Sequence, residues 1–370
     1  MDFDRRDVLK TGAALSLAAV LPRPAYADGV LAPRPGRWRS FEITTRLEIA
    51  QMEGKPQAWI PLPSVNEKDW FKSEGSRWTT NGEARQARDP HSGAEMLHVE
   101  WDASEQAPVV EVTSKISTQD RAVDLSKPGD ASVSISLAER KFNTEGTELI
   151  PIDGIVKQTS DQIIAVTAAT TEVEKVHAIY AWIVANTFRD PKVRGCGIGD
   201  IASMLRTGNL GGKCADLNAL FVGLVRAAGI PARDVYGIRV APSIFGYKAL
   251  GANSETITKA QHCRAEVFLS GYGWVATDPA DVRKVVLEEP PGNLAIDDSK
   301  VEAARKTLFG AWEGNWLAYN TAHDIALPGS KGPKIGFLMY PQAECGSARL
   351  DCLDPDTFKY TIKSKELTSA

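Results

Sequence analysis

The chain of 370 residues lacks the marks of several large protein classes. Lys and Arg number 43 against 47 Asp and Glu, so the net charge of −4 provides no basic excess for nucleic-acid binding. No two cysteines have Cys-x-x-Cys spacing, which argues against a zinc site, and no Asp-rich loop indicates calcium. We therefore expect a globular protein that binds no nucleic acid and requires no metal or other cofactor.

The first residues carry an export signal rather than part of the fold. Arg5 and Arg6 precede a short apolar run over 12–21, and Ala25-Tyr26-Ala27 is a small-x-small cleavage site. Paired arginines are typical of twin-arginine export. The run is too short for a membrane span, and no second run of spanning length follows. We expect cleavage after Ala27 and a periplasmic protein with no stable membrane span after processing; a retained N-terminal anchor is the alternative.

The stretch 38–150 predicts an antiparallel β-domain and its connector. Runs of alternating apolar and polar residues cover 41–49, 57–62, 95–101 and 109–116. Four tryptophans fall in this part: Trp59, Trp70, Trp78 and Trp101. Packing in the core of a β-sandwich is their favoured role, and an exposed platform for a carbohydrate or peptide is the alternative.

A cysteine stands where a glycine-rich segment leads into a helix. Cys214 follows Gly211-Gly212-Lys213. Apolar residues then recur at helical spacing: Leu217, Leu220, Phe221, Leu224 and Val225. The helix is expected to end at Gly229 and Pro231. Free N–H groups and the positive end of the helix dipole favour a thiolate at Cys214, the form that nucleophilic cysteine chemistry requires.

A histidine and an aspartate occupy the two ends of a predicted hairpin. Residues 261–269 form a strand pattern, 271–274 a glycine-rich turn, and 275–279 a second strand that ends at a proline. In a hairpin the start of one strand faces the end of the next, which brings His262 to Asp278. An imidazole beside a carboxylate is the arrangement that orients a catalytic base.

These blocks, in this order, resemble the transglutaminase-like superfamily of papain-type cysteine enzymes. The matching residues are Gly212-Lys213-Cys214, Gly229-Ile230-Pro231-Ala232-Arg233, His262 with Glu266, Gly273-Trp274-Val275 and Asp278-Pro279. The resemblance covers roughly 160–290 and implies an α+β fold: a papain-like/transglutaminase-like core with an N-terminal antiparallel β-domain. It also implies Cys214 as the nucleophile, His262 as the general base and Asp278 as the residue that orients the base.

Two departures from the family pattern flank these positions. Cys263-Arg264 stands where the family usually has Ala-Trp, and Ala280 stands where it usually has Thr. The resemblance leaves the oxyanion-hole side chain unassigned, so the backbone N–H of Cys214 is the expected donor.

The reaction that the resemblance implies is attack of a thiolate on a carbonyl carbon through a thioester intermediate. The leading hypothesis is a hydrolase (peptidase or amidase) that acts on a peptide or protein substrate. The alternatives are an acyltransferase that crosslinks glutamine side chains to amines, and a non-catalytic binding or assembly module on the same fold.

Other residues receive supporting roles. A catalytic core is expected over 159–290, with Thr171 in a capping box before a helix, and a C-terminal extension over 291–370 that packs on the core. Asp216 and Asn218 are expected to cap the helix or contact the hairpin, and Glu266 to accept a hydrogen bond or form a salt bridge. Arg233 and Arg239 are expected to pair with acidic neighbours or line the cleft.

The five cysteines leave one unpaired if the others form disulfides. Cys345 and Cys352 are expected to close a small loop. A pairing of Cys196 with Cys263 would leave Cys214 free as the nucleophile.

Overall fold

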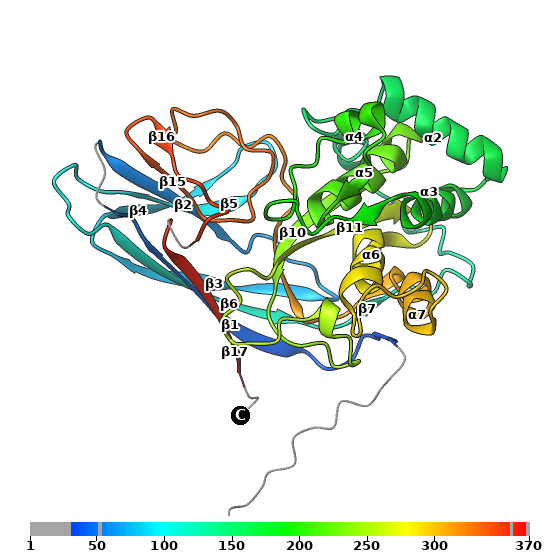
Figure 1. The fold of residues 1–370 in the computed structure, drawn as a ribbon, viewed down its shortest axis with the longest axis horizontal. Helices are drawn as coiled ribbons and strands as arrows, with labels where there is room; N and C mark the ends of the chain where they lie inside the picture. The colour runs from blue at the N-terminus through cyan, green and yellow to red at the C-terminus, as the bar shows by residue number, and fades with distance from the viewer. Residues whose placement is uncertain (1–30, 51–53, 356–357, 368–370) are drawn as a thin grey trace, which may run out of the picture.

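The structure is a computed structural model that describes residues 31–50, 54–355 and 358–367. The proposed signal segment 1–27 and its cleavage site lie outside these residues. Helices gather at one end of the molecule and β-sheets at the other (Figure 1). None of the helices in the described ranges combines the length and the apolar character needed to cross a bilayer.

The helical end is built on a six-stranded sheet in the order β14-β10-β11-β12-β13-β7. Its strands are β7 (Arg121–Ala122), β10 (Ala232–Arg239), β11 (Gln261–Leu269), β12 (Gly273–Thr277), β13 (Phe309–Trp312) and β14 (Trp316–Asn320). The helices are α1 (Leu137–Phe142), α2 (Gly154–Thr167), α3 (Glu172–Asn186), α4 (Ile201–Thr207), α5 (Cys214–Ala227), α6 (Pro279–Glu288), α7 (Ser299–Thr307) and the 3₁₀ turn η1 (Lys248–Leu250). A short parallel pair joins β8 (Phe188–Arg189) to β9 (Gly211–Gly212).

Helix α5 is the centre of this part of the molecule. All of its residues are buried, because it packs against β10 and β11 on one side and against α2, α3, α4 and α6 on the others. Such burial suits a helix whose apolar residues are not confined to one stripe. The capping box predicted at Thr171 is present at the start of α3, where Thr171 and Glu174 satisfy each other's backbone N–H groups.

Two antiparallel sheets form the β-rich end. One has the order β17-β1-β6-β3 and the other the order β16-β15-β2-β5-β4. Their strands are β1 (Arg39–Glu48), β2 (Pro56–Leu62), β3 (Phe71–Thr80), β4 (Glu83–Arg88), β5 (Glu95–Glu100), β6 (Val109–Thr118), β15 (Gln342–Cys345), β16 (Ala348–Arg349) and β17 (Tyr360–Leu367). Four of these match predicted strands, whereas β3 and β4 were missed because their residues are mostly polar and exposed. Trp59, Trp70 and Trp101 are buried, as the core role predicts.

The C-terminal residues differ from the expected extension on the core. Strands β13 and β14 do extend the core sheet, but β15, β16 and β17 pair with the N-terminal strands β2 and β1. The edges of β1 and β2 present backbone N–H and C=O groups that the last strands satisfy.

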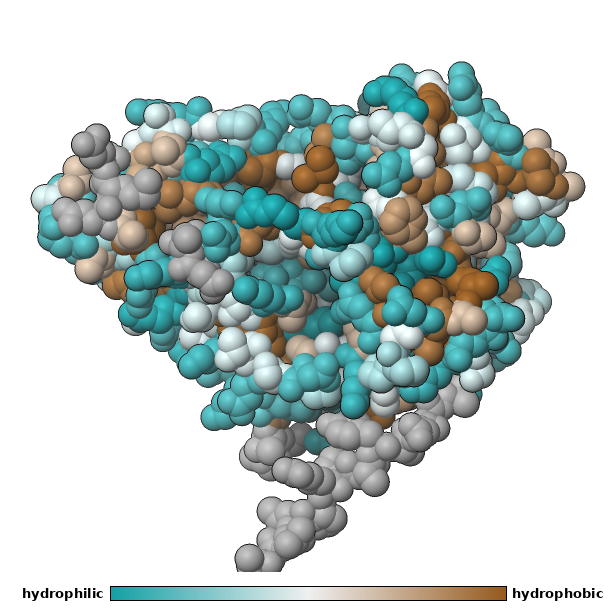
Figure 2. Space-filling view, in the orientation of Figure 1, coloured by the Kyte–Doolittle hydropathy of each residue, from teal (hydrophilic) through white to brown (hydrophobic). Residues whose placement is uncertain are grey.

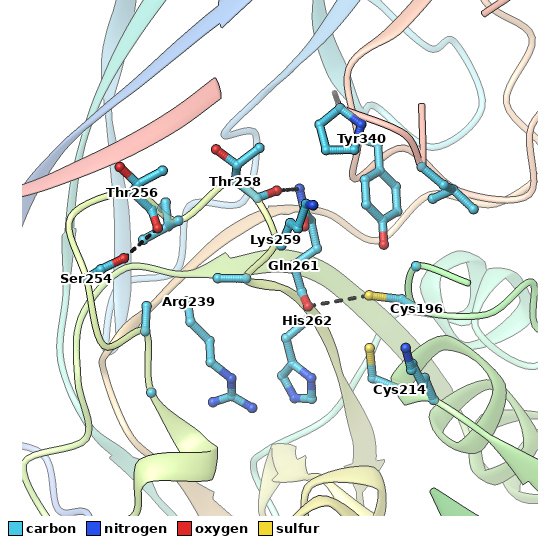
Figure 3. A pocket seen from close by; sticks show the side chains of 18 of the residues that line it. Cys196, Cys214, Arg239, Ser254, Thr256, Thr258, Lys259, Gln261, His262 and Tyr340 are labelled. Atoms are coloured by element: carbon cyan, nitrogen blue, oxygen red, sulfur yellow. Dashed lines mark hydrogen bonds between the residues drawn. The ribbon is translucent and has the colours of Figure 1, made fainter. Parts of the chain in front are cut away.

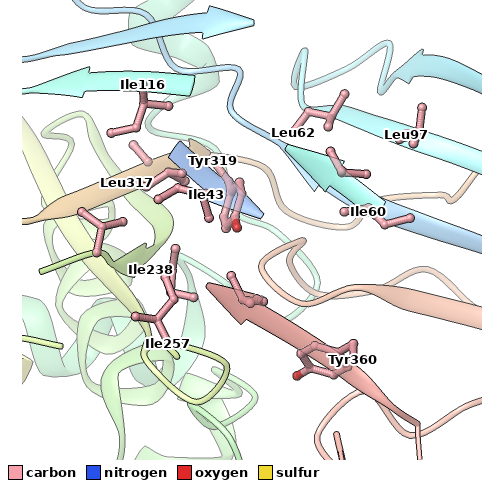
Figure 4. Close-up of a cluster of buried hydrophobic side chains, with 14 of the residues drawn as sticks. Ile43, Ile60, Leu62, Leu97, Ile116, Ile238, Ile257, Leu317, Tyr319 and Tyr360 are labelled. Atoms are coloured by element: carbon pink, nitrogen blue, oxygen red, sulfur yellow. The ribbon is translucent and has the colours of Figure 1, made fainter. Parts of the chain in front are cut away.

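One hydrophobic cluster joins the two ends of the molecule (Figure 4). It combines Ile43 and Ile60 from the β-rich end with Ile238 and Leu317 from the core sheet, and all four are at most 2 % exposed. Because the cluster is continuous and includes Tyr360 of β17, the β-rich end and the core pack as one body.

Candidate active site

A cavity of about 530 Å³ opens where the core meets the segment leading into β17. The start of α5 and the start of β11 form its base, and Tyr340 and Tyr360 stand on the opposite side. Figure 3 shows Cys196, Cys214 and His262 together at the base, with the Tyr340 hydroxyl directed toward them. The loop 251–261 forms another wall, which β17 anchors through hydrogen bonds such as Ile257 N to Ile362 O at 2.8 Å.

Cys214 is the first residue of α5, and Asp216 fixes the backbone around it. One carboxylate oxygen of Asp216 accepts a hydrogen bond from Lys213 N, and the other accepts from Ile198 N and Gly199 N, all at 3.0 Å. Gly197 permits this clamp, because its φ is +92° and an added Cβ would lie 1.8 Å from the Asp216 carboxylate. Asp216 therefore caps the helix, as expected, and also ties the loop over 195–199 to the start of α5.

His262 and Asp278 come together through the predicted hairpin. Strands β11 and β12 pair antiparallel, and Asp278 follows directly as the N-cap of α6. The His262 Nε2 atom lies 2.7 Å from Asp278 Oδ2, and both residues are buried. This contact leaves Nδ1 as the ring nitrogen available to the Cys214 thiol, which is within hydrogen-bonding reach of the ring. The structure thus brings all three predicted site residues together.

The charges around these groups favour an ion pair. Burial opposes ionisation of the Cys214 thiol, but hydrogen bonds from Cys196, Cys263 and His262 outweigh it and hold its pKa well below the usual value. Burial also acts to lower the pKa of His262, but the Asp281 and Asp278 carboxylates overcome it and raise that pKa to about 9. At neutral pH the arrangement therefore holds a thiolate beside an imidazolium.

Asp281 is a residue of the site that the sequence analysis missed. Its Oδ1 lies 3.4 Å from His262 Nε2, and its two oxygens accept hydrogen bonds of 2.6 and 2.7 Å from Arg239. Burial favours the neutral acid, but Arg239 and His262 lower the pKa of Asp281 well below its ordinary value. The sequence could have indicated Asp281, because it lies three residues after Asp278, within the first turn of a helix that a proline begins.

Three thiols meet at the base of the cavity. Cys196 and Cys263 both hydrogen-bond the Cys214 thiol, and all three are buried. All five cysteines of the chain are free in the structure, so neither expected disulfide is present. Cys345 instead lies in β15 opposite Ala348. The thiol of Cys196 donates a hydrogen bond of 3.4 Å to the backbone oxygen of Gln261, as Figure 3 shows.

Arg264, one of the residues that depart from the family pattern, lies close to the site. Arg264 lies buried between the rings of Trp312 and Trp316, with its guanidinium 5.1 and 4.8 Å from their centres, and burial lowers its pKa to about 10. Its Nε is 3.9 Å from Asp278 Oδ2. Trp316 also donates a hydrogen bond of 3.0 Å to the backbone oxygen of His262.

The other predicted residues take structural positions. Asn218 contacts the hairpin by donating to Cys263 O at 2.9 Å and to Asp278 Oδ1 at 3.2 Å. Glu266 forms a buried salt bridge with Arg233 and Arg121, away from the thiols. Arg239 both lines the cavity and pairs with Asp281.

A metal ion could in geometric terms be held by His262, Asp278 and Asp281, whose ligand atoms lie within 4.8 Å of one another. The donor set does not fit this role well. Arg239 already neutralises Asp281, and His262 carries a proton at neutral pH, whereas a metal requires a neutral imidazole. A hydrogen-bonded charge network accounts for the three residues.

The chain is similar in sequence to known proteins. The sequence model of the transglutaminase-like superfamily matches residues 157–279, which contain Cys214, His262 and Asp278. An uncharacterized protein of Haemophilus influenzae is 36 % identical over 334 residues, covering 85 % of this chain and 87 % of its own.

Solved structures are more distant. One is the crystal structure of a protein from Cytophaga hutchinsonii that is named a cysteine protease by inference. Its sequence is 14 % identical to this chain and the TM-score is 0.49; the match covers 89 % of this chain and 99 % of that one. The periplasmic domain of TgpA from Pseudomonas aeruginosa is 17 % identical with a TM-score of 0.33, over 66 % of this chain and 88 % of that domain.

The fold and the site together define an α+β protein with a thiol at a helix start and an imidazole and a carboxylate on an adjoining hairpin. The chain belongs to the transglutaminase-like superfamily.

Proposed function

We propose that this protein is an exported cysteine hydrolase that cleaves peptide or amide bonds through a thioester intermediate. The observation that carries the proposal is that Cys214 and His262 lie together at the base of one cavity, with the thiol within hydrogen-bonding reach of the ring and Asp278 behind it, 2.7 Å from Nε2. The compartment is part of the proposal and rests on the twin-arginine pattern before Ala27.

The first chemical step uses the preformed ion pair. The Cys214 thiolate attacks the carbonyl carbon, and negative charge develops on the carbonyl oxygen. The backbone N–H of Cys214 lies in the first turn of α5 and has no acceptor among the described residues, so it is available to bind that oxygen. The His262 imidazolium then gives its proton to the leaving amine, and the acyl group remains on sulfur.

The second step reverses the proton transfer. Neutral His262 takes a proton from water, water attacks the thioester, and the thiolate returns. Asp278 holds the ring through Nε2 during both steps, so that Nδ1 faces the sulfur. An amine that replaced water in this step would make the protein an acyltransferase, because the thioester is the same in both reactions.

The test compares purified wild type with Cys214→Ala and with the matched control Cys345→Ala. Glutamine-containing peptides are followed by mass spectrometry for cleavage and for loss of ammonia, with and without a tagged primary amine. The proposal expects water-dependent products from wild type and the control, and none from Cys214→Ala. Equal turnover by wild type and Cys214→Ala would refute a cysteine enzyme. Incorporation of the tagged amine in place of hydrolysis would identify the acyltransferase.

A further inference from the structure

Two sulfur atoms share the base of the cavity. Cys196 and Cys214 both line it, and Figure 3 shows their sulfur atoms close together. The two thiols are within hydrogen-bonding reach of each other. Cys196 is 5 % exposed and Cys214 is 3 % exposed, so a reagent must be small to reach either sulfur. Hydrophilic side chains cover much of the middle of the face shown in Figure 2, which favours approach by a small polar reagent.

The backbone holds the two cysteines side by side. Ala215 N, next to Cys214, donates a hydrogen bond of 2.9 Å to the backbone oxygen of Cys196. A disulfide requires Cα atoms about 4.4–6.8 Å apart, and a backbone hydrogen bond between neighbouring segments is compatible with that spacing. Glycines flank Cys196 at positions 195 and 197, with φ of +54° and +92°, so the backbone around this cysteine carries no other side chain that would oppose a small adjustment.

The two thiols have different protonation states. Cys214 is the thiolate of the ion pair with His262, whereas its hydrogen bond with Cys196, together with burial, raises the pKa of Cys196 well above the usual value. Cys196 therefore keeps its proton while Cys214 is ionised. A reactive thiolate with a second thiol in contact is the arrangement typical of redox-sensitive cysteines.

Cys263 also contacts the Cys214 thiol, but it is placed less well to act as the second thiol. It is 0 % exposed and lies within strand β11, opposite Tyr236 of β10, and it does not line the cavity. An oxygen atom added to the Cys214 sulfur from the cavity would stand on the side of Cys196. The loop 195–199 also has more freedom to adjust than a strand held in the middle of a sheet.

We propose that Cys196 and Cys214 form a redox site, in which a small hydroperoxide converts the two thiols into a disulfide and a dithiol restores them. The inference goes beyond the proposed hydrolase, because it requires the reactive thiolate but no acyl donor. The disulfide occupies the sulfur that would attack a carbonyl carbon, so its formation switches off any reaction that uses Cys214 as the nucleophile.

The oxidation takes place in two balanced steps. In the first, the Cys214 thiolate attacks one oxygen of the hydroperoxide; an S–O bond forms, the O–O bond breaks, and the leaving oxygen takes the His262 proton and departs as water or an alcohol. Cys214 becomes a sulfenic acid and the hydroperoxide is reduced by two electrons. In the second, the Cys196 sulfur attacks the Cys214 sulfur; the S–S bond forms, the S–O bond breaks, and hydroxide leaves with the Cys196 proton as water.

The first test maps the disulfide directly in wild type. The five cysteines fall in five different tryptic peptides, because a Lys or Arg separates each from the next. Reduced protein is treated with hydrogen peroxide, blocked with iodoacetamide and digested without reductant. We expect one crosslink, between the peptides 195–206 and 214–226, that dithiothreitol removes. Oxidation of Cys214 to sulfinic acid without a crosslink, a crosslink to Cys263, or no reaction of Cys214 overturns the inference.

Two variants test the role of Cys196. Cys196→Ser keeps a group that can donate to Gln261 O but removes the sulfur. After peroxide it should show several-fold more labelling of Cys214 by dimedone, which traps sulfenic acids, and dithiothreitol should recover much less of the free Cys214 thiol than in wild type. Cys345→Ala, which changes a cysteine in β15 outside the cavity, is the matched control and should behave as wild type. Equal labelling and equal recovery in Cys196→Ser and wild type overturn the inference.

A peptide assay separates the redox site from the proposed function. Turnover of glutamine-containing peptides is measured for reduced, peroxide-treated and re-reduced wild type, beside the crosslink in the same samples. We expect turnover to be lost in proportion to the crosslink and regained with dithiothreitol. Full turnover by crosslinked protein overturns the switch. Absence of turnover in all three samples overturns the hydrolase alone, because the crosslink is mapped without a substrate.

Discussion

Replacing Asp281 by asparagine is expected to lower the pKa of His262. Asp281 is one of the two carboxylates that raise this pKa, with its Oδ1 3.4 Å from Nε2. The variant keeps the shape of the side chain and removes its charge. It also leaves the Arg239 guanidinium, which itself lowers the pKa of His262, without its acidic partner.

The size of the effect follows from the wild-type value. A pKa raised from 6.5 to about 9 corresponds to about 3 kcal/mol in favour of the imidazolium. Because Asp278 remains in place at 2.7 Å, only part of this is lost. We expect the pKa of His262 to decrease by about 1–2 pH units in Asp281→Asn. The imidazolium would then be lost near neutral pH, and the alkaline limb of any activity profile would move down with it.

The measurement is an NMR titration of protein labelled with ¹³C at histidine Cε1. The chain has five histidines, and the His262 resonance is identified by its loss in His262→Gln. The double variant Arg239→Met with Asp281→Asn is the matched control, because it removes the unpaired guanidinium as well.

We predict how the pKa of His262 ranks among wild type and the two variants. The pKa of His262 should be highest in wild type, intermediate in the double variant and lowest in Asp281→Asn, while urea unfolding verifies that each variant folds cooperatively. An unchanged titration midpoint in Asp281→Asn would refute the idea that Asp281 holds the proton on His262.

Three further predictions concern single buried groups. Burial raises the pKa of Asp234 from its ordinary value of 3.8 to about 7. Between these two pH values the folded state binds more protons than the unfolded state, so the free energy of unfolding decreases as pH rises through that window. Between pH 5 and 8 the free energy of unfolding of wild type should therefore decrease by about 2–3 kcal/mol more than that of Asp234→Asn, and parallel urea curves would contradict this. Glu266→Gln removes the buried carboxylate that pairs with Arg121 and Arg233, and only Arg233 keeps a second acidic partner, Glu67. The variant should cost about 3–5 kcal/mol of unfolding free energy, so an unchanged urea midpoint would count against the salt bridge. Cys196→Ala removes a hydrogen bond to the Cys214 thiolate and should raise the pKa of Cys214 by about 1 pH unit. The rate of alkylation by iodoacetamide, followed against pH, should then have its midpoint at a higher pH than in wild type. A midpoint at the same or a lower pH would show that Cys196 does not stabilise the thiolate.

Local patterns predicted the parts of the site that lie within single elements. The helix after Cys214, the capping box at Thr171 and the hairpin that joins His262 to Asp278 are all present as expected. Each depends on interactions between residues close in the sequence: helical periodicity, an N-cap contact and a short turn between paired strands. The N-terminal strands with alternating apolar residues were found for the same reason, whereas the polar strand β3 gave no such pattern.

Contacts between segments that are distant in the sequence could be identified only in the tertiary structure. The pairing of β17 with β1 joins the two ends of the described chain, and nothing local to residues 360–367 indicates which edge they meet. Arg239 reaches Asp281 across 42 positions of sequence. Cys196 and Cys263 both lie at Cys214, although the sequence suggested that they pair with each other. The sequence by itself predicted that Cys214, His262 and Asp278 lie together, because each stands at the end of a regular element. Only the packing of α5 between the hairpin and the loop 195–199 decided which charges and thiols surround them, because burial and long-range contacts set the protonation of those groups.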